Sequence, residues 1–105
     1  MRLEMVHTDV WGPSPVSSLG GSRFYVTFID DFSRKVWVYF LKHKSDVIAT
    51  FKKWKAKVEN QTSLKVKCLR SDNGGEYDKS EFKAFCAAEG IGLMRKVPGK
   101  AKWNC

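Results

Sequence analysis

The sequence predicts one α/β domain over residues 1–105: a mixed five-stranded sheet flanked by helices, in the order β-β-β-α-β-α-β. Two runs rich in β-forming residues, 24–29 and 35–41, are joined by a short polar turn, which is typical of an antiparallel hairpin. The hydrophobic period then becomes helical over residues 47–58 and returns to alternation at 64–71. Strands joined through helices pair in parallel with right-handed crossovers, so the sheet is expected to be mixed.

Three strands are predicted in the N-terminal half. Residues 3–10 alternate loosely between apolar and polar side chains, and the Trp-Gly-Pro sequence at 11–13 ends this strand. The hairpin follows, with Asp30 and Asp31 expected to cap its turn. Both hairpin runs carry apolar residues on both faces, so we expect helices to cover at least one of them on both sides.

Two helices and two strands are predicted in the C-terminal half. The first helix, with Ser45 as its N-cap, has one apolar stripe at i, i+4, i+7 and i+11. This stripe consists of Val47, Phe51, Trp54 and Val58. After the strand at 64–71, a second helix begins near Asp78, whose spacing to Glu81 is typical of a capping box. Gly90 ends that helix as its C′ residue, and residues 91–97 form the fifth strand.

Charge and composition narrow the function classes. Lys+Arg 19 against Asp+Glu 11 gives a net charge of +8, which favours an anionic partner, nucleic acid before a membrane surface. A hydrophobic content of 43% excludes intrinsic disorder. No apolar run approaches the ~20 residues of a membrane span, and none resembles a signal peptide, so we expect an intracellular protein. Three cysteines without a C-x-x-C pair suggest neither a zinc site nor a disulfide framework, so Cys68 and Cys86 are expected to be buried thiols.

Two acidic residues lie at the carboxyl ends of predicted strands, where a polar side chain is exposed. Asp9 lies near the carboxyl end of the first strand, and Asp72 comes directly after the fourth. If these strands are neighbours, both carboxylates lie at one edge of the sheet, where open α/β sheets bind ligands. Paired carboxylates there suit Mg²⁺, a hard cation with oxygen ligands. The alternative is that both are solvated turn or cap aspartates.

Three segments carry a resemblance to a known family. They are residues 7–13 (HTDVWGP), 25–34 (YVTFIDDFSR) and 70–77 (RSDNGGEY). Together, and in this order, they resemble the integrase core of copia-type LTR retrotransposon Pol polyproteins. The resemblance implies a ribonuclease H-like fold and a DDE-type polynucleotidyl transferase that joins element DNA to target DNA with Mg²⁺ or Mn²⁺. It assigns Asp9 and Asp72 to the first two catalytic, metal-binding carboxylates, and it implies a nuclear location and a homodimer.

The resemblance also marks a departure. The family's third acid, a Glu on a following helix, comes roughly 35 residues after Asp72 and completes the metal cage. That position lies beyond Cys105, so we expect a partial catalytic core that lacks the final helix and does not transfer strands. The alternatives are a basic nucleic-acid-binding module without catalysis and a decayed fragment of the element.

Five further residues are candidates for contact with nucleic acid. The backbone of Asn73, Gly74 and Gly75 can approach a phosphate, although a tight turn that leaves the strand is the plainer interpretation of the glycines. Lys52 and Lys53 lie on the polar face of the first helix, where a solvated surface is the plainer interpretation. Trp11 and Trp37 are expected to pack in the core or at its edge rather than to stack on bases.

Overall fold

Six strands form one mixed sheet in the computed structural model, which describes residues 2–13, 21–71, 77, 79–97 and 100–102. The strands are β1 (Val6–Trp11), β2 (Phe24–Asp30), β3 (Val36–Leu41), β4 (Cys68–Ser71), β5 (Gly92–Val97) and β6 (Lys100–Lys102). A 3₁₀ turn, η1 (Lys44–Asp46), leads into helix α1 (Val47–Thr62), and α2 (Ser80–Ala88) lies between β4 and β5. Among the described residues, neither helix is long and apolar enough to cross a membrane.

The strand order β3-β2-β1-β4-β5-β6 places β1 in the interior of the sheet. The pairs β1–β2 and β2–β3 are antiparallel, whereas β1–β4 and β4–β5 are parallel. This arrangement confirms the predicted mixed sheet and its five strands. The short antiparallel strand β6 was not predicted and extends the sheet beyond β5.

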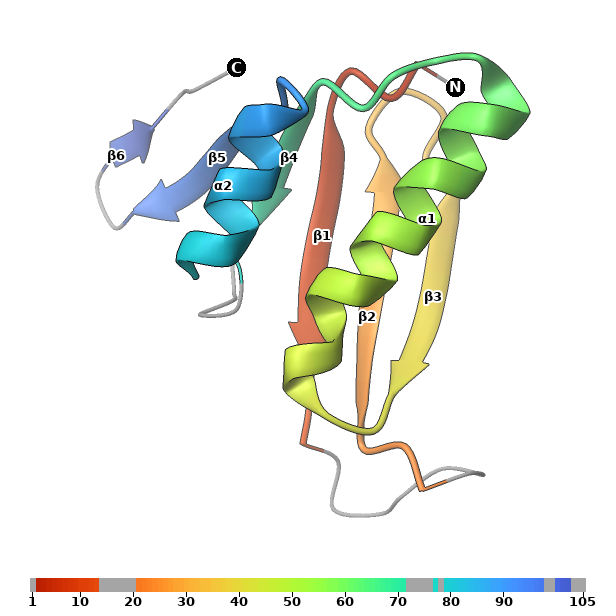
Figure 1. Ribbon diagram of the computed structural model, residues 1–105, viewed down its shortest axis with the longest axis vertical. Helices are drawn as coiled ribbons and strands as arrows, with labels where there is room; N and C mark the ends of the chain where they lie inside the picture. Colours follow the sequence, from red (N-terminus) through yellow and green to blue (C-terminus); the bar gives the residue numbers. More distant parts are fainter. Residues whose placement is uncertain (1, 14–20, 72–76, 78, 98–99, 103–105) are drawn as a thin grey trace.

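Both helices cover the same face of the sheet. Figure 1 shows α1 crossing in front of β1–β3 and α2 in front of β4 and β5. The connections β3–α1–β4 and β4–α2–β5 both step across the sheet in the same direction, so right-handed crossovers place both helices on one side. The expectation of helices on both sides of a hairpin strand was therefore wrong for the part of the chain described here.

Aromatic side chains fill the space between α1 and the sheet. The Trp54 ring stacks on Phe28, with 4.5 Å between centroids and 12° between planes. Phe51 contacts Phe82 of α2 edge-on at 5.4 Å, so the same cluster joins the two helices. All four side chains are buried. The predicted apolar stripe of the first helix is confirmed as core.

The helix ends differ in part from the predictions. Asp46, not Ser45, is the N-cap of α1, because the chain turns through η1 before the helix begins. Helix α2 begins at Ser80 after Lys79, and Asp78 lies outside the described residues. Gly90 is confirmed as a C′ glycine: its φ is 71°, and Ile91 N–H donates to the Cys86 carbonyl at 2.8 Å.

The hairpin turn is held by a buried aspartate. Asp30 accepts hydrogen bonds from the Leu3 amide at 2.9 Å and the Ser33 amide at 2.8 Å. Burial raises the pKa of Asp30, but these hydrogen bonds outweigh burial and leave the pKa below its ordinary value. The predicted capping role is thus confirmed for Asp30, which also ties the turn to the chain before β1.

The cysteine prediction holds for one residue only. Cys86 is a buried free thiol, and burial raises its pKa to about 11. Cys68 is buried as predicted but is disulfide-bonded, so the expectation of a free thiol was wrong there. The absence of a C-x-x-C pair argues against a framework of bridges, but it does not exclude a single one.

One buried ionic group connects α1 to the neighbouring elements. The Lys55 ammonium lies 2.8 Å from Glu59 and 3.6 Å from Glu89, just past the end of α2. The other Glu59 oxygen accepts the Val66 amide at 2.8 Å, close to the start of β4. Burial raises the pKa of Glu59, but the bonds from Lys55 and Val66 outweigh it and hold the pKa below 4.5.

The Glu59→Gln substitution is predicted to lower the free energy of unfolding at neutral pH by about 1–3 kcal/mol. The reason is that Lys55 and Val66 donate to different Glu59 oxygens, and the Gln NH₂ group that replaces one of them cannot accept. Folding lowers the pKa of Glu59. The contribution of the carboxylate to the free energy of unfolding is therefore complete above pH 4.5, and it is lost as the pH falls through the folded-state pKa. Urea unfolding at a series of pH values should show wild type and variant converging in acid.

Glu81→Gln is the matched control, because Glu81 is exposed in the first turn of α2. It should change stability by no more than about 0.5 kcal/mol. A Glu59→Gln deficit that stays constant across the pH range would contradict the assignment.

Candidate active site

Strand β1 divides its side chains between the core and the open face of the sheet. Val6, Thr8 and Val10 are buried beneath the helices. Asp9 and Trp11 belong to the alternate set, which points to the face that carries neither described helix. Asp9 is half-buried and lies opposite Thr27 of β2. The first predicted carboxylate is therefore held by an interior strand and faces outward.

The end of β4 lies beside Asp9. The parallel register pairs Val6 with Leu69 and His7 with Arg70, and β4 ends at Ser71. The two strands predicted to be neighbours are thus neighbours, with their carboxyl ends in the same direction. Asp72, the next residue in the sequence, lies outside the described residues, as do Asn73, Gly74 and Gly75. The convergence of Asp9 with Asp72 stays a prediction.

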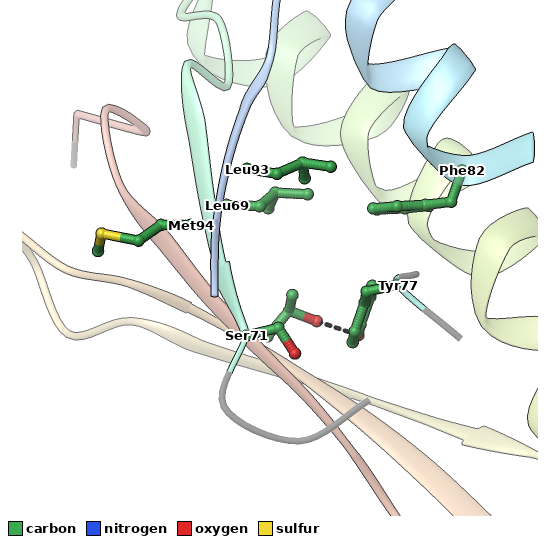
Figure 2. Close-up of a pocket in the computed structure, with 7 residues that line it drawn as sticks. Leu69, Ser71, Tyr77, Phe82, Leu93 and Met94 are labelled. Carbon is green, nitrogen blue, oxygen red and sulfur yellow. Dashed lines mark hydrogen bonds between the residues drawn. The ribbon is translucent and has the colours of Figure 1, made fainter. Parts of the chain in front are cut away.

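A buried hydrogen bond fixes the chain that returns from this edge. The Tyr77 hydroxyl lies 2.5 Å from the Thr8 hydroxyl, and both side chains are buried. Figure 2 shows the Tyr77 side chain pointing toward the strand that carries Ser71, with the hydrogen bond dashed. The Tyr77 ring also packs edge-on against Phe82 of α2 at 5.2 Å. Residues 71 and 77 are therefore both anchored near Thr8, the residue before Asp9.

Tyr77 and Thr8 were not recognised as site residues from the sequence. The available signal was a threonine in the core-facing phase of β1, because a buried hydroxyl needs a partner. Burial raises the pKa of Tyr77, and the nearby Asp9 charge raises it further. The hydroxyl therefore stays protonated and acts as a structural hydrogen-bonding group.

The cavity beside this pair is too small for a substrate. It measures about 10 Å³, roughly the space of one water molecule, and its lining includes Leu69, Ser71, Tyr77 and Leu93. A ligand of DNA size therefore cannot bind in this cavity.

Gly12 ends β1 in a conformation that other residues rarely adopt. Its φ is 125°, and a Cβ atom there would lie 2.7 Å from the Arg23 carbonyl oxygen. Only glycine lets the chain leave Trp11 this close to the start of β2. The conformation of Gly12 therefore fixes the point at which β1 ends, directly after the outward-facing Trp11.

The structure separates Lys52 and Lys53 from Asp9. Both lysines are exposed on α1, which covers the opposite face of the sheet from Asp9. The Lys52 ammonium lies 4.9 Å from the Phe85 ring centre. Lys53 lines a shallow cleft of about 380 Å³, which Phe40 and Lys42 also line. Whether either lysine contacts nucleic acid stays a prediction.

A second polar pair lies at the other end of β1. His7 shares a hydrogen bond of 2.7 Å with Asp31, which lowers the pKa of the Asp31 carboxyl. Arg34 adds a longer contact at 3.7 Å. Within the described ranges, no three His, Cys, Asp or Glu side chains gather as a metal cluster.

Comparison with known proteins gives a consistent result. Residues 1–101 match the Integrase core domain family. The chain is 50% identical over 102 residues to the retrovirus-related Pol polyprotein from transposon TNT 1-94 of Nicotiana tabacum, covering 97% of this chain and 8% of that protein. It is 47% identical over 102 residues to the corresponding polyprotein from transposon RE2 of Arabidopsis thaliana, covering 97% and 7%. The chain thus spans less than a tenth of these relatives.

A solved structure shares the fold. A chain in the cryo-electron microscopy structure of the simian T-cell lymphotropic virus intasome, in complex with the PP2A regulatory subunit B56 gamma, superimposes with a TM-score of 0.69. The match covers 93% of the present chain and 33% of that chain, at 17% identity. At this identity the likeness shows the fold alone, and it confirms the predicted ribonuclease H-like architecture.

Removal of the Tyr77 hydroxyl by Tyr77→Phe is predicted to cost about 1–3 kcal/mol of unfolding free energy, because the Thr8 hydroxyl is left buried without a partner. Thr8→Val should cost a similar amount for the converse reason. The double variant should be close to wild type, since both polar groups are then gone. Urea unfolding of all four proteins measures this cycle, and additive losses in the double variant would contradict a direct bond.

Proposed function

The chain belongs to the integrase core domain family, and we propose that its residues form the DNA-joining core of a retrotransposon Pol polyprotein. In this proposal Asp9 and Asp72 are the first two metal-binding carboxylates. Phosphoryl transfer then joins an end of element DNA to target DNA. The resemblance narrows the element to the copia type, and the target implies action in the nucleus.

One observation carries the proposal: β1 and β4 are parallel neighbours, and Asp9 lies at the edge where β4 ends. Asp72 is joined covalently to Ser71, the last residue of β4. The proposal therefore brings Asp72 to the edge where Asp9 lies. This is the place where open α/β sheets bind their ligands.

The donor chemistry of these residues fits a divalent cation. Asp9 is a half-buried carboxylate on a central strand, so its position is set by the sheet while the residue stays partly exposed. Mg²⁺ and Mn²⁺ prefer carboxylate oxygens and keep several waters, so they do not require an all-protein cage. When bound, such ions stabilise the charge that develops on the transferring phosphate.

The remaining features of the chain support binding of DNA. Its net charge of +8 attracts a polyanion and makes the attraction dependent on salt. The hydrogen bond between Thr8 and Tyr77 fixes the Tyr77 side chain beside β1, at the residue next to Asp9 in the sequence. In phosphoryl transfer, positioning and charge stabilisation provide most of the rate, so a fixed framework around Asp9 suits the proposed chemistry.

The isolated polypeptide of 105 residues is expected to be catalytically inactive. The resemblance assigns two carboxylates to it, and the third ligand of the metal cage is a Glu that lies further along in the family. With two acids, a first metal ion retains ligands but a second is poorly fixed. We therefore expect metal and DNA binding without joining of DNA ends, and we propose that the active assembly is a homodimer.

Titration of the polypeptide with Mn²⁺, followed by the electron paramagnetic resonance of the free ion, tests the metal site. Asp9→Asn and Asp72→Asn should each weaken Mn²⁺ binding by at least about tenfold, because each removes a charged ligand. Asp46→Asn is the control, since Asp46 is exposed at the start of α1 and should bind as wild type does.

The same proteins distinguish the alternative functions. Unchanged Mn²⁺ binding in both aspartate variants would contradict the metal site. If those variants also bind duplex DNA with the same salt dependence as wild type, the chain is a non-catalytic basic binding module. Joining of DNA ends by the 105-residue polypeptide would contradict the expected inactivity.

A further inference from the structure

Three exposed aromatic side chains form a row across the open face of the sheet. The register pairs Trp11 with Tyr25 and Tyr25 with Phe40, so one residue comes from each of β1, β2 and β3. Trp11 and Tyr25 stack with centroids 6.1 Å apart and 19° between planes, and Tyr25 and Phe40 follow at 6.4 Å. Their exposed fractions are 44%, 38% and 66%. Of the two predicted positions for Trp11, the core or its edge, the core is therefore excluded.

This aromatic row lies next to the candidate metal carboxylate. Asp9 is two residues before Trp11 on the same strand face, a distance of roughly 7 Å along the strand. Asp9 is opposite Thr27, which is opposite Val38, so the neighbouring row holds one acid and two uncharged side chains. A ligand on the aromatic row thus reaches the site of the proposed chemistry.

Positive charge lies on the other side of the row. Phe24 and Leu41 form the pair at the end of β2 and β3 next to the row. Arg23 comes directly before Phe24, Lys42 comes directly after Leu41, and both are exposed. Lys42 shares the shallow cleft with Phe40 and Lys53. Flat apolar rings bordered by cations fit a ligand with aromatic bases on an anionic backbone.

We propose that Trp11, Tyr25 and Phe40 form a stacking platform for the unpaired bases of a DNA strand. Bases stack on exposed aromatic side chains without regard to sequence, while nearby cations follow the phosphates. Bases within a duplex are already stacked on one another, so the platform takes single-stranded or frayed DNA. The proposal rests on the proposed function in that DNA is the ligand, but it requires no metal ion.

The test is binding of a fluorescent oligothymidylate, measured by anisotropy at low salt in the presence of EDTA. Trp11→Ala, Tyr25→Ala and Phe40→Ala should each weaken binding by roughly 5- to 150-fold, the range of one stacked base. Tyr25→Phe should retain binding because it keeps the ring. All three residues are exposed, and circular dichroism checks that the variants are folded.

Phe32→Ala is the matched control. Phe32 is 61% exposed, but it lies just after β2, at the end of that strand away from the row. The Arg2 guanidinium carbon lies 4.4 Å from the centre of its ring. Its loss should leave binding of the oligonucleotide unchanged. An equal loss in Phe32→Ala would show a general effect of exposed phenylalanine and would overturn the proposal.

Three further results would overturn the platform. One is that the wild type does not bind oligothymidylate, or that the three alanine variants bind it as wild type does. Another is equal weakening of an abasic oligonucleotide, because that ligand has no bases to stack. The third is a dimer that dissociates in the variants while DNA binding is retained, which would assign this face to a second copy of the chain.

The oligothymidylate assay tests the platform independently of the Mn²⁺ titration, which tests the metal site. Asp9→Asn should keep its binding of oligothymidylate in EDTA, because the platform acts without the carboxylate. Loss of Mn²⁺ binding with intact stacking supports both proposals. Intact stacking together with Mn²⁺ binding that is insensitive to both aspartates supports the platform and refutes the metal site.

Discussion

The two crossover connections run in the same direction across the sheet, and this handedness determines the character of both faces. A right-handed path from β3 through α1 to β4, followed by another from β4 through α2 to β5, leaves both helices on one side. The alternation of β1 then sorts its side chains. Val6, Thr8 and Val10 enter the core, whereas Asp9 and Trp11 face outward. A charged residue on an interior strand is thereby kept accessible without burial of its charge.

Because both helices cover one face of the sheet, polar groups on that face are buried and need hydrogen-bond partners within the core. Thr8 points under the helices, where a lone hydroxyl would be costly, and Tyr77 supplies its partner across 69 positions of sequence. The Glu59 carboxylate similarly accepts hydrogen bonds from the Lys55 ammonium and the Val66 amide, between α1 and β4. The first bond joins the middle of β1 to the chain before α2, and the second joins α1 to the chain before β4. Together they fix the two strands that border the candidate site.

Periodicity was sufficient to predict both helices and the first five strands but not the short strand β6. The stripe around Phe51 and Trp54 is core, and Gly90 ends α2 as its left-handed conformation requires. The start of α1 was misplaced because η1, a local turn, precedes the helix and moves the N-cap from Ser45 to Asp46. The disulfide of Cys68 was missed because cysteine spacing reports frameworks rather than single bridges.

The candidate site could be predicted only in part, for a reason of topology. Asp9 was identified because it lies near the carboxyl end of a strand, but the face of the sheet that it occupies depends on where the helices cross. For the same reason at least one hairpin strand was expected to be covered on both sides, whereas Val36, Val38 and Phe40 are exposed on β3. The hydrogen bond between Thr8 and Tyr77 and the aromatic row join residues from different strands. Such contacts follow from register, which a single sequence does not specify.

The central claim is that the carboxylates of Asp9 and Asp72 meet on the open face at the junction of β1 and β4. Anomalous diffraction from a crystal of the 105-residue polypeptide soaked in Mn²⁺ tests it most directly. We predict a manganese peak within about 2.0–2.3 Å of an oxygen from each carboxylate, on the side of the sheet away from α1 and α2. Carboxylates that point to opposite faces, or a peak that lies elsewhere, would contradict the account.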